Sequence, residues 1–326
     1  MAETTYIDAI RDALLEEMER LPTMIVLGED IQEGGVFRVT DGMLDRFGPG
    51  RVLDTPLAES SIVGVAIGMA TNGCVPVAEM QFADFAFPAF NQIISEAAKW
   101  RYRSNNGWGC PIVVRAPSGG GIRGALYHSQ SIEAMLAHVP GLKVVAPATP
   151  YDAKGLLKAA IRDPDPVIYL EQKRAYRLLK GDVPAGDFTV SIGEAALRRE
   201  GDDLTVISYG MTAYECLAAA DELAADGISA TVLDLRTLAP LDRDAILDAA
   251  KRTGKVLIVH EDNLTGGIGG EVAAIIAEHA FDFLDAPIRR LAGLDVPSMP
   301  YSAVMEAYFM PSREKIVTAM RELAAY

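Results

Sequence analysis

Glu29, Glu59 and His128 are the residues in the first half of the chain best suited by type to acid–base chemistry. Carboxylate and imidazole groups are those most often used to give or accept protons in catalysis. Glu59 follows a turn-forming Thr-Pro pair and precedes an apolar stretch, so we expect it where a strand leads into a helix. A first-turn glutamate can simply be favoured by the helix dipole, worth about 0.3–1 kcal/mol. Burial could instead raise its pKa by roughly 3–5, so a structural and a catalytic role both stay open.

His128 lies in a polar cluster, Tyr127–Gln130, directly after a glycine-rich loop. A histidine on irregular backbone is well placed to contact a ligand, although a local bond between the imidazole and the backbone is the simpler alternative. The other histidines, His138, His260 and His279, look less exposed to a shared cleft. Four phenylalanines follow Gln81, and we assign most of them to the core, while one could stack on a flat cofactor ring.

The glycine-rich loop itself, Gly119–Gly124, fits the spacing G-x-G-x-x-G after a predicted strand. In a dinucleotide-binding fold an acidic residue should follow a strand about 20 residues later, where Lys143–Ala146 stands instead. The chain has neither a Walker-type phosphate loop nor a G-x-S-x-G nucleophile elbow. We therefore expect these glycines to let the loop approach a ligand or bend near His128.

Short β-rich runs alternate with helical patterns along the chain, which is typical of an α/β fold with largely parallel sheets. In the first half, strands are predicted at Met24–Leu27, Val75–Met80, Ile112–Arg115, Lys143–Ala146 and Val167–Leu170. Helices are predicted near Ser60–Ala70, Pro88–Arg101 and Asp152–Ile161. Ligands of open α/β sheets bind where parallel strands end, so Glu29, Glu59, Gln81 and the loop Ser118–His128 are candidates for one site.

The alternation lapses over Gln172–Asp187 and then resumes, which predicts two domains covering residues 1–180 and 190–326. In the second half, strands are predicted at Leu204–Tyr209, Ala230–Leu233, Val256–Val259 and Ile288–Leu291. Helices are predicted near Tyr214–Ala225, Asp244–Arg252, Glu271–His279 and Arg313–Ala324. This half shows no obvious catalytic cluster.

The charge of the chain limits its partners. Its 326 residues include 30 basic and 45 acidic side chains, a formal net charge of −15 that disfavours nucleic acid or an anionic membrane surface. No apolar run approaches the roughly 20 residues of a membrane span, so we expect a cytoplasmic protein. The three cysteines, Cys74, Cys110 and Cys216, lack metal-binding or redox spacing and are interpreted as structural.

Several ordered motifs together resemble the β subunit of the decarboxylating component of 2-oxo acid dehydrogenases. They are Leu27–Asp30, Gly34–Arg38, Asp54–Glu59, Gln81–Phe90, Arg101–Ser104, Ala125–Ser131, Tyr151–Leu156, Leu233–Thr237 and Leu264–Gly267. The likeness extends across nearly the whole chain. The segments 82–90 and 127–131 look closer to branched-chain enzymes than to pyruvate enzymes.

The resemblance implies a pyrimidine-binding thiamine diphosphate domain followed by a transketolase C-terminal-like domain, in an α2β2 assembly with the cofactor between chains. It implies that Glu59 contacts the aminopyrimidine nitrogen and Phe85 stacks on the ring, with the cofactor wall completed by Glu29, Leu57, Ala58 and Gln81. It places substrate beside Phe82, Ala83, Asp84, Phe85 and His128. A structural potassium ion is implied near Ile112, Ala160, Asp163 and Asp165, largely on backbone carbonyls, and the α subunit would hold Mg²⁺.

The implied reaction is oxidative decarboxylation of a 2-oxo acid with acyl transfer to a lipoyl group on the acyltransferase core. Glu59 would share a proton with the ring nitrogen, and His128 would either steady substrate charge or protonate the lipoyl sulfur. A basic segment of the acyltransferase would dock near Asp285 and the carboxylate of Tyr326. A pyruvate or acetoin enzyme of the same architecture, or a catalytically silent assembly protein, are the alternatives. A self-sufficient transketolase-like enzyme is disfavoured because no Gly-Asp-Gly segment followed by Asn-Asn occurs in the sequence.

Overall fold

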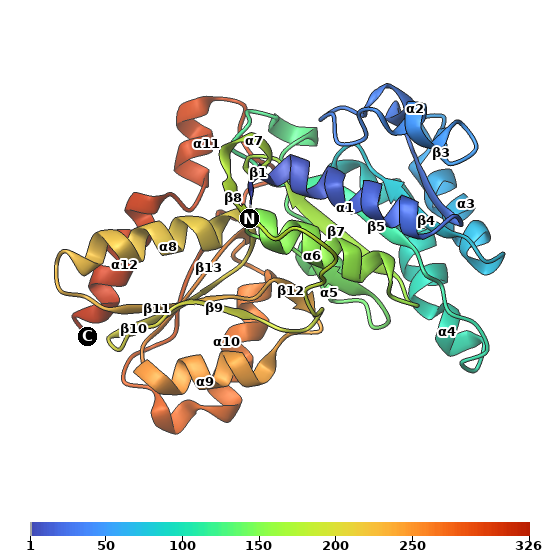
Figure 1. Cartoon of the computed structure of the whole chain (residues 1–326). Coiled ribbons are helices and arrows are strands. Elements are labelled where there is room, and N and C mark those ends of the chain that lie inside the picture. The colour runs from blue at the N-terminus through green and yellow to red at the C-terminus, as the bar shows by residue number, and fades with distance from the viewer. Residues whose placement is uncertain (1) are drawn as a thin grey trace. The chain divides into compact units, whose positions relative to one another are not determined.

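The computed structural model describes residues 2–326, and the chain divides by its packing into two units (Figure 1). The first unit contains the chain up to Ser118 together with Met135–Ile192, and the second contains Gly119–Ala134 together with Gly193–Tyr326. The segment that carries the glycine loop and His128 therefore packs with the second unit, although it is enclosed in sequence by the first. Each unit is described by itself below.

The first unit is built on a parallel sheet with the strand order β6-β7-β5-β4-β2-β3. Its strands are β2 (Met24–Gly28), β3 (Val52–Asp54), β4 (Val75–Glu79), β5 (Val113–Ser118), β6 (Lys143–Val145) and β7 (Val167–Gln172). A separate antiparallel pair joins β1 (Ala2–Thr5) to β8 (Lys180–Val183). The α/β class and the predicted strands of this half are confirmed. Within 172–187, where the alternation in the sequence lapses, the chain forms β8 and a short helix.

The helices of the first unit are α1 (Tyr6–Arg20), α2 (Met43–Phe47), α3 (Glu59–Thr71), α4 (Trp100–Arg103), α6 (Pro150–Ile161) and α7 (Ala175–Leu178). Thr5 and Thr149 begin α1 and α6 by accepting hydrogen bonds from backbone N–H groups in the first turn. Figure 1 shows α1 and α6 side by side, where Glu16 receives hydrogen bonds from Lys154 and Lys158 at 2.6 Å. The predicted helix near Asp152–Ile161 is confirmed, whereas α1 was not predicted.

One predicted helix, Pro88–Arg101, is not a regular α-helix. The chain instead forms 3₁₀ turns at Ala83–Ala89 and Ala97–Lys99 on either side of a π-helical turn at Asn91–Glu96, and then α4. Pro88 has no N–H to donate within a helix, which interrupts the regular pattern. Turns of π type often occur near functional sites, and this one follows the aromatic segment after Gln81.

The second unit contains a five-stranded sheet with the order β14-β13-β10-β11-β9, in which only β9 is antiparallel to its neighbour. The strands of this sheet are β9 (Ala196–Arg199), β10 (Leu204–Ser208), β11 (Ala230–Asp234), β13 (Val256–Asn263) and β14 (Arg289–Gly293), and the short strand β12 (Thr237–Ala239) is not part of it. The four predicted strands of this half are confirmed. The sheet places the acidic end of β13 beside β14.

Helices cover both faces of this sheet (Figure 1). They are α8 (Gly210–Ala224), α9 (Arg243–Thr253), α10 (Ile268–His279) and α12 (Arg313–Ala324). The short helix α11 (Ala303–Phe309) follows β14 in the chain, and α5 (Glu133–Ala137) contains the point at which the chain leaves the second unit for the first. Buried apolar residues of α8 and α12 pack with those of β10, β11 and β13 in one core. In residues 2–326 no helix is both long enough and apolar enough to cross a membrane.

Candidate active site

Glu29 and Glu59 lie close enough at one edge of the first unit to interact electrostatically. Glu29 follows β2, is only 4% exposed, and neither of its carboxylate oxygens has a hydrogen-bond partner among residues 2–326. Burial, with the negative charges of Glu59 and Asp30 as further causes, raises the pKa of Glu29 to about 7. A carboxyl group in this state can exchange a proton near neutral pH.

Glu59 is the first residue of α3, as predicted, and its side chain is half-buried rather than enclosed. No side chain caps this helix, because the residue before it is Ala58. Leu57 is 82% exposed on the same turn. The turn thus presents a half-buried carboxylate beside an exposed apolar side chain.

The segment after β4 adds amide and aromatic groups to the same unit. Gln81 donates from its side-chain amide to Asp30 at 3.0 Å, which ties this segment to the turn after β2. The rings of Phe85 and Phe82 meet edge to face with centroids 5.4 Å apart, and Phe82 makes a similar contact with Phe37. Ala83 and Asp84, which the sequence assigns to substrate, are buried, whereas Phe82 and Phe85 are half-buried.

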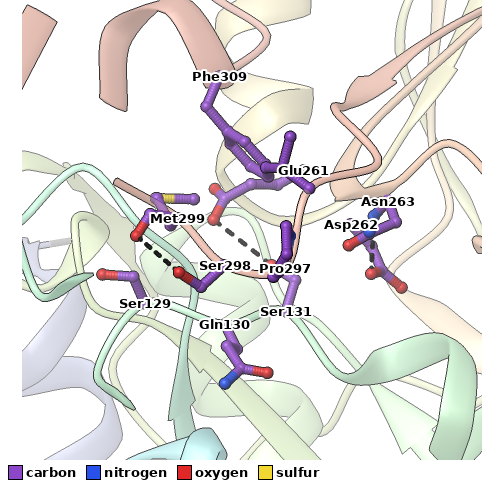
Figure 2. Close-up of a pocket in the computed structure, with 11 residues that line it drawn as sticks. Ser129, Gln130, Ser131, Glu261, Asp262, Asn263, Pro297, Ser298, Met299 and Phe309 are labelled. Carbon is purple, nitrogen blue, oxygen red and sulfur yellow. Dashed lines mark hydrogen bonds between the residues drawn. The ribbon is translucent and has the colours of Figure 1, made fainter. Parts of the chain in front are cut away.

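His128 lies in the second unit, half-buried, on the loop that follows the glycines. Directly after it begins a cavity of about 90 Å³ within this unit, formed mainly by polar residues (Figure 2). Its lining residues are Ser129, Gln130, Ser131, Glu261, Asp262, Asn263, Val296, Pro297, Ser298, Met299 and Phe309. Figure 2 shows the Ser131 hydroxyl bonded to the Glu261 carboxylate across this cavity, at 3.4 Å.

Folding also gathers a buried acidic cluster in the second unit that the sequence did not reveal. Tyr209 donates to one oxygen of Glu133 at 2.9 Å, while the other oxygen has no partner in the described part of the chain. Burial, followed by the charges of Asp262 and Glu261, raises the pKa of Glu133 to about 8. Burial also raises the pKa of Asp262 to about 6. The available signal was the Glu-Asp pair at the end of β13, where ligand-facing residues of a parallel sheet are expected.

Of the predicted potassium residues, Ala160, Asp163 and Asp165 lie near one another in sequence, and both carboxylates are already bonded to cationic side chains. Asp163 accepts hydrogen bonds from Lys143, and Asp165 accepts one from Arg101 at 2.6 Å. Ile112 and Ala160 are buried apolar residues that could offer only backbone carbonyls. Within residues 2–326 no three His, Cys, Asp or Glu side chains converge as a metal site.

Comparison with protein families defines the class. The description "Transketolase, pyrimidine binding domain" matches residues 2–179, and "Transketolase, C-terminal domain" matches residues 193–316. A solved structure described as "Split gene transketolase, inactive beta4 tetramer" is similar with a TM-score of 0.78 and 25% identity, covering 98% of each chain. The chain is therefore made of two transketolase-type domains, as the sequence implied.

Curated relatives narrow this class. The 2-oxoisovalerate dehydrogenase subunit beta of Bacillus subtilis is 62% identical, with both chains covered in full. The mitochondrial 2-oxoisovalerate dehydrogenase subunit beta 2 of Arabidopsis thaliana is 47% identical over 98% of this chain and 88% of its own. The pyruvate dehydrogenase E1 component subunit beta of Bacillus subtilis is 43% identical, again with full coverage of both. This chain belongs to the family of 2-oxo acid dehydrogenase β subunits.

Proposed function

We propose that this chain is the β subunit of a thiamine diphosphate-dependent dehydrogenase that acts on branched-chain 2-oxo acids and passes the acyl unit to lipoyl groups. The observation that carries the proposal is the pair Glu29 and Glu59, in which a buried carboxyl with no hydrogen-bond partner among residues 2–326 lies close to a half-buried one. Support for the substrate class is the 62% identity to a subunit named for 2-oxoisovalerate, against 43% to one named for pyruvate.

The residues of the first unit fit the aminopyrimidine half of the cofactor. Glu29 offers two unpartnered buried oxygens, Glu59 an accessible carboxylate, and Phe85 a half-buried ring. Leu57, Ala58 and Gln81 complete the proposed wall. When bound, thiamine diphosphate supplies the nucleophilic carbon that attacks the 2-oxo group.

Glu59 is the proposed proton-exchanging residue of this wall. Its position at the start of α3 leaves its side chain half-exposed. Glu29, whose pKa is raised to about 7, holds a proton for part of the time at neutral pH and so reduces the repulsion between the two groups. When Glu29 holds its proton, a proton that Glu59 gives to a ring nitrogen leaves one negative charge on the pair rather than two.

His128 is the proposed substrate-facing residue, either steadying the charge of the 2-oxo acid or protonating the lipoyl sulfur. The polar cavity that begins at Ser129 supports a role with a charged or polar ligand in this unit. We propose four further residues on the substrate side of the site: Phe82, Ala83, Asp84 and Phe85. Of these, Ala83 and Asp84 are buried.

Ions and partners follow from the family. We propose that an α subunit completes an α2β2 heterotetramer and holds Mg²⁺ at the cofactor diphosphate, and that the assembly docks on a lipoyl-bearing acyltransferase core in the cytoplasm. A structural potassium ion is proposed at backbone carbonyls near Ile112 and Ala160, because the carboxylates of Asp163 and Asp165 are already bonded to cationic side chains. The proposed domain limits are 1–180 and 190–326.

The test is to purify the chain alone and together with its α subunit, and to assay decarboxylation of 3-methyl-2-oxobutanoate, pyruvate and acetoin side by side. We expect activity only in the assembled complex, with the highest kcat/KM for the branched substrate. The isolated chain should bind thiamine diphosphate weakly with or without Mg²⁺. A preference for pyruvate or acetoin would reassign the substrate. Tight Mg²⁺-dependent binding of thiamine diphosphate by the isolated chain would overturn the proposal that the α subunit holds the Mg²⁺.

A further inference from the structure

The loop that leads to His128 is held in an unusual backbone conformation. Gly119 and Gly121 have positive φ angles of 81° and 79°, and the non-glycine residues Arg123 and Ala125 have φ angles of 59° and 56°. Left-handed backbone is uncommon for residues with a Cβ and persists where surrounding contacts enforce it. The contacts that enforce it here come from the same unit.

Two buried carboxylates bind the backbone of this loop. Glu306 of α11, 6% exposed, accepts hydrogen bonds at 3.0 Å from the N–H groups of both Gly121 and Arg123. Glu261 of β13, 5% exposed, accepts a short bond from the N–H of Gly120. Hydrogen bonds from N–H groups to a charged, buried acceptor are among the stronger ones in proteins. Three N–H groups of the loop, those of Gly120, Gly121 and Arg123, are thus directed at two buried carboxyl groups.

The helix that carries Glu306 is itself anchored. The seven residues of α11 are too few to be stable on their own hydrogen bonds. Lys315 donates to the backbone carbonyls of Ala307, Tyr308 and Met310 at the end of this helix. Glu306 is therefore a fixed acceptor, and its position is set from outside the loop.

The loop transmits this position to His128 by direct packing. Gly124 follows Arg123, and a Cβ added to Gly124 would lie 2.5 Å from the carbonyl oxygen of His128 and 2.8 Å from its Cβ. At the other end of the loop, a Cβ on Gly120 would lie 2.0 Å from the sulfur of Met299. The backbone at Gly124 therefore lies directly against the backbone of His128, whereas at Gly120 the neighbour is the flexible side chain of Met299.

We propose that Glu306 is a positioning residue for His128, which it orients by fixing the N–H groups of Gly121 and Arg123. The inference rests on the proposed function, because orienting His128 matters only if that imidazole serves the reaction. Glu306, which lies 178 positions after His128 in the chain, would thus help to set the orientation of the substrate-facing imidazole.

The first experiment compares Glu306→Gln and Glu306→Ala with the parent in the assembled α and β complex. Glu222→Gln, an exposed carboxylate on α8, is the matched control. Glutamine keeps an acceptor oxygen but loses the charge, so we expect amide hydrogen exchange of residues 119–131 to increase in Glu306→Gln and to increase further in Glu306→Ala. Misplacement of a reacting group by about 1 Å can cost up to about 100-fold in rate. We therefore expect kcat to fall about 10-fold or more in Glu306→Ala, and less in Glu306→Gln.

A second experiment separates positioning from a general structural effect. If Glu306 acts through His128, then Glu306→Gln should lower kcat in the parent but change it by less than about 2-fold when His128→Ala is already present. An equal loss in both backgrounds would overturn the proposal, and so would unchanged exchange of residues 119–131 or unchanged kcat despite faster exchange. Should the parent complex fail to decarboxylate any 2-oxo acid, the proposed function fails. The exchange data would still decide whether Glu306 holds the loop.

Discussion

Two buried glutamates of the first unit, Glu171 and Glu29, differ in the hydrogen bonds that their carboxyl groups receive. Both oxygens of Glu171 accept hydrogen bonds from Arg115, and one also accepts from the hydroxyl of Tyr176 at 2.6 Å. Glu29 has no hydrogen-bond partner for either oxygen within residues 2–326. Buried polar groups are usually satisfied, so an unsatisfied one indicates either a cost retained for function or a group awaiting a ligand.

The network around Arg115 stabilises the interior of the sheet. Arg115 is fully buried and also donates to Glu79 at 2.6 Å, so one cation serves two carboxylates. Burial raises the pKa of Glu79 even though Arg115 opposes it. The comparison teaches that charge alone does not identify a candidate active site. What distinguishes Glu29 is that neither of its oxygens has a hydrogen-bond partner in the described part of the chain.

The largest loss of stability is expected when the cation that satisfies Glu79 and Glu171 is removed. Arg115→Met keeps the length of the side chain but leaves Glu79 and Glu171 buried without their cation, which should cost about 3–5 kcal/mol of unfolding free energy. Urea unfolding of the isolated chain measures this loss. The control is Arg103→Met, which removes an exposed pair with Glu96 and should cost at most about 1 kcal/mol. Equal losses of unfolding free energy in the two variants would show that the buried network contributes no more to stability than the exposed pair.

Removing the unsatisfied group should produce a smaller effect that depends on pH. The folded-state pKa of Glu29 is raised from its ordinary 4.5 to about 7, so its contribution to stability is fully present below pH 4.5 and is lost as the pH rises through 7. Glu29→Gln abolishes this loss. The stability of the variant relative to the parent should therefore increase between pH 5 and pH 8, whatever constant cost the buried amide brings.

Urea midpoints measured every half unit of pH for both proteins give that difference. Glu133 and Asp262 also have raised pKa values, but they are present in both proteins and cancel in the comparison. A difference that stays flat or declines between pH 5 and pH 8 would mean that Glu29 is compensated in the folded chain.

The smallest effect concerns carboxylates that are exposed. Asp285 lies at the surface, and we expect it to attract a basic segment of the acyltransferase core. Exposed charges are screened by salt, with a Debye length of about 8 Å at physiological ionic strength. Raising salt from 50 to 500 mM should weaken binding of the assembled complex to the core mainly by slowing association, as measured by surface plasmon resonance. An affinity that does not change between 50 and 500 mM salt would show that charge does not contribute to docking.

Much of this arrangement was predictable because it is local in sequence. A Thr-Pro turn followed by an apolar helix predicted the position of Glu59, and β-branched runs predicted the sheets. The regular helix at 88–101 failed because a proline and a π-helical turn interrupt it. The grouping of the His128 loop with the second unit could not be predicted, because Gly120 and Gly121 meet carboxylates 141 and 185 residues away. That Glu29 has no hydrogen-bond partner among residues 2–326 also could not be predicted, because it depends on which side chains the fold brings near it.

Turnover of Glu59→Gln in the complex with the α subunit and cofactor tests the central claim most directly. Glutamine keeps the shape of the side chain but cannot exchange a proton with a ring nitrogen. We predict that decarboxylation falls by roughly 100-fold or more. Thermal stability and binding to the α subunit should stay near those of the parent, since a helix-terminus effect is worth only about 1 kcal/mol. Near-normal turnover in a folded, cofactor-loaded Glu59→Gln complex would contradict the account.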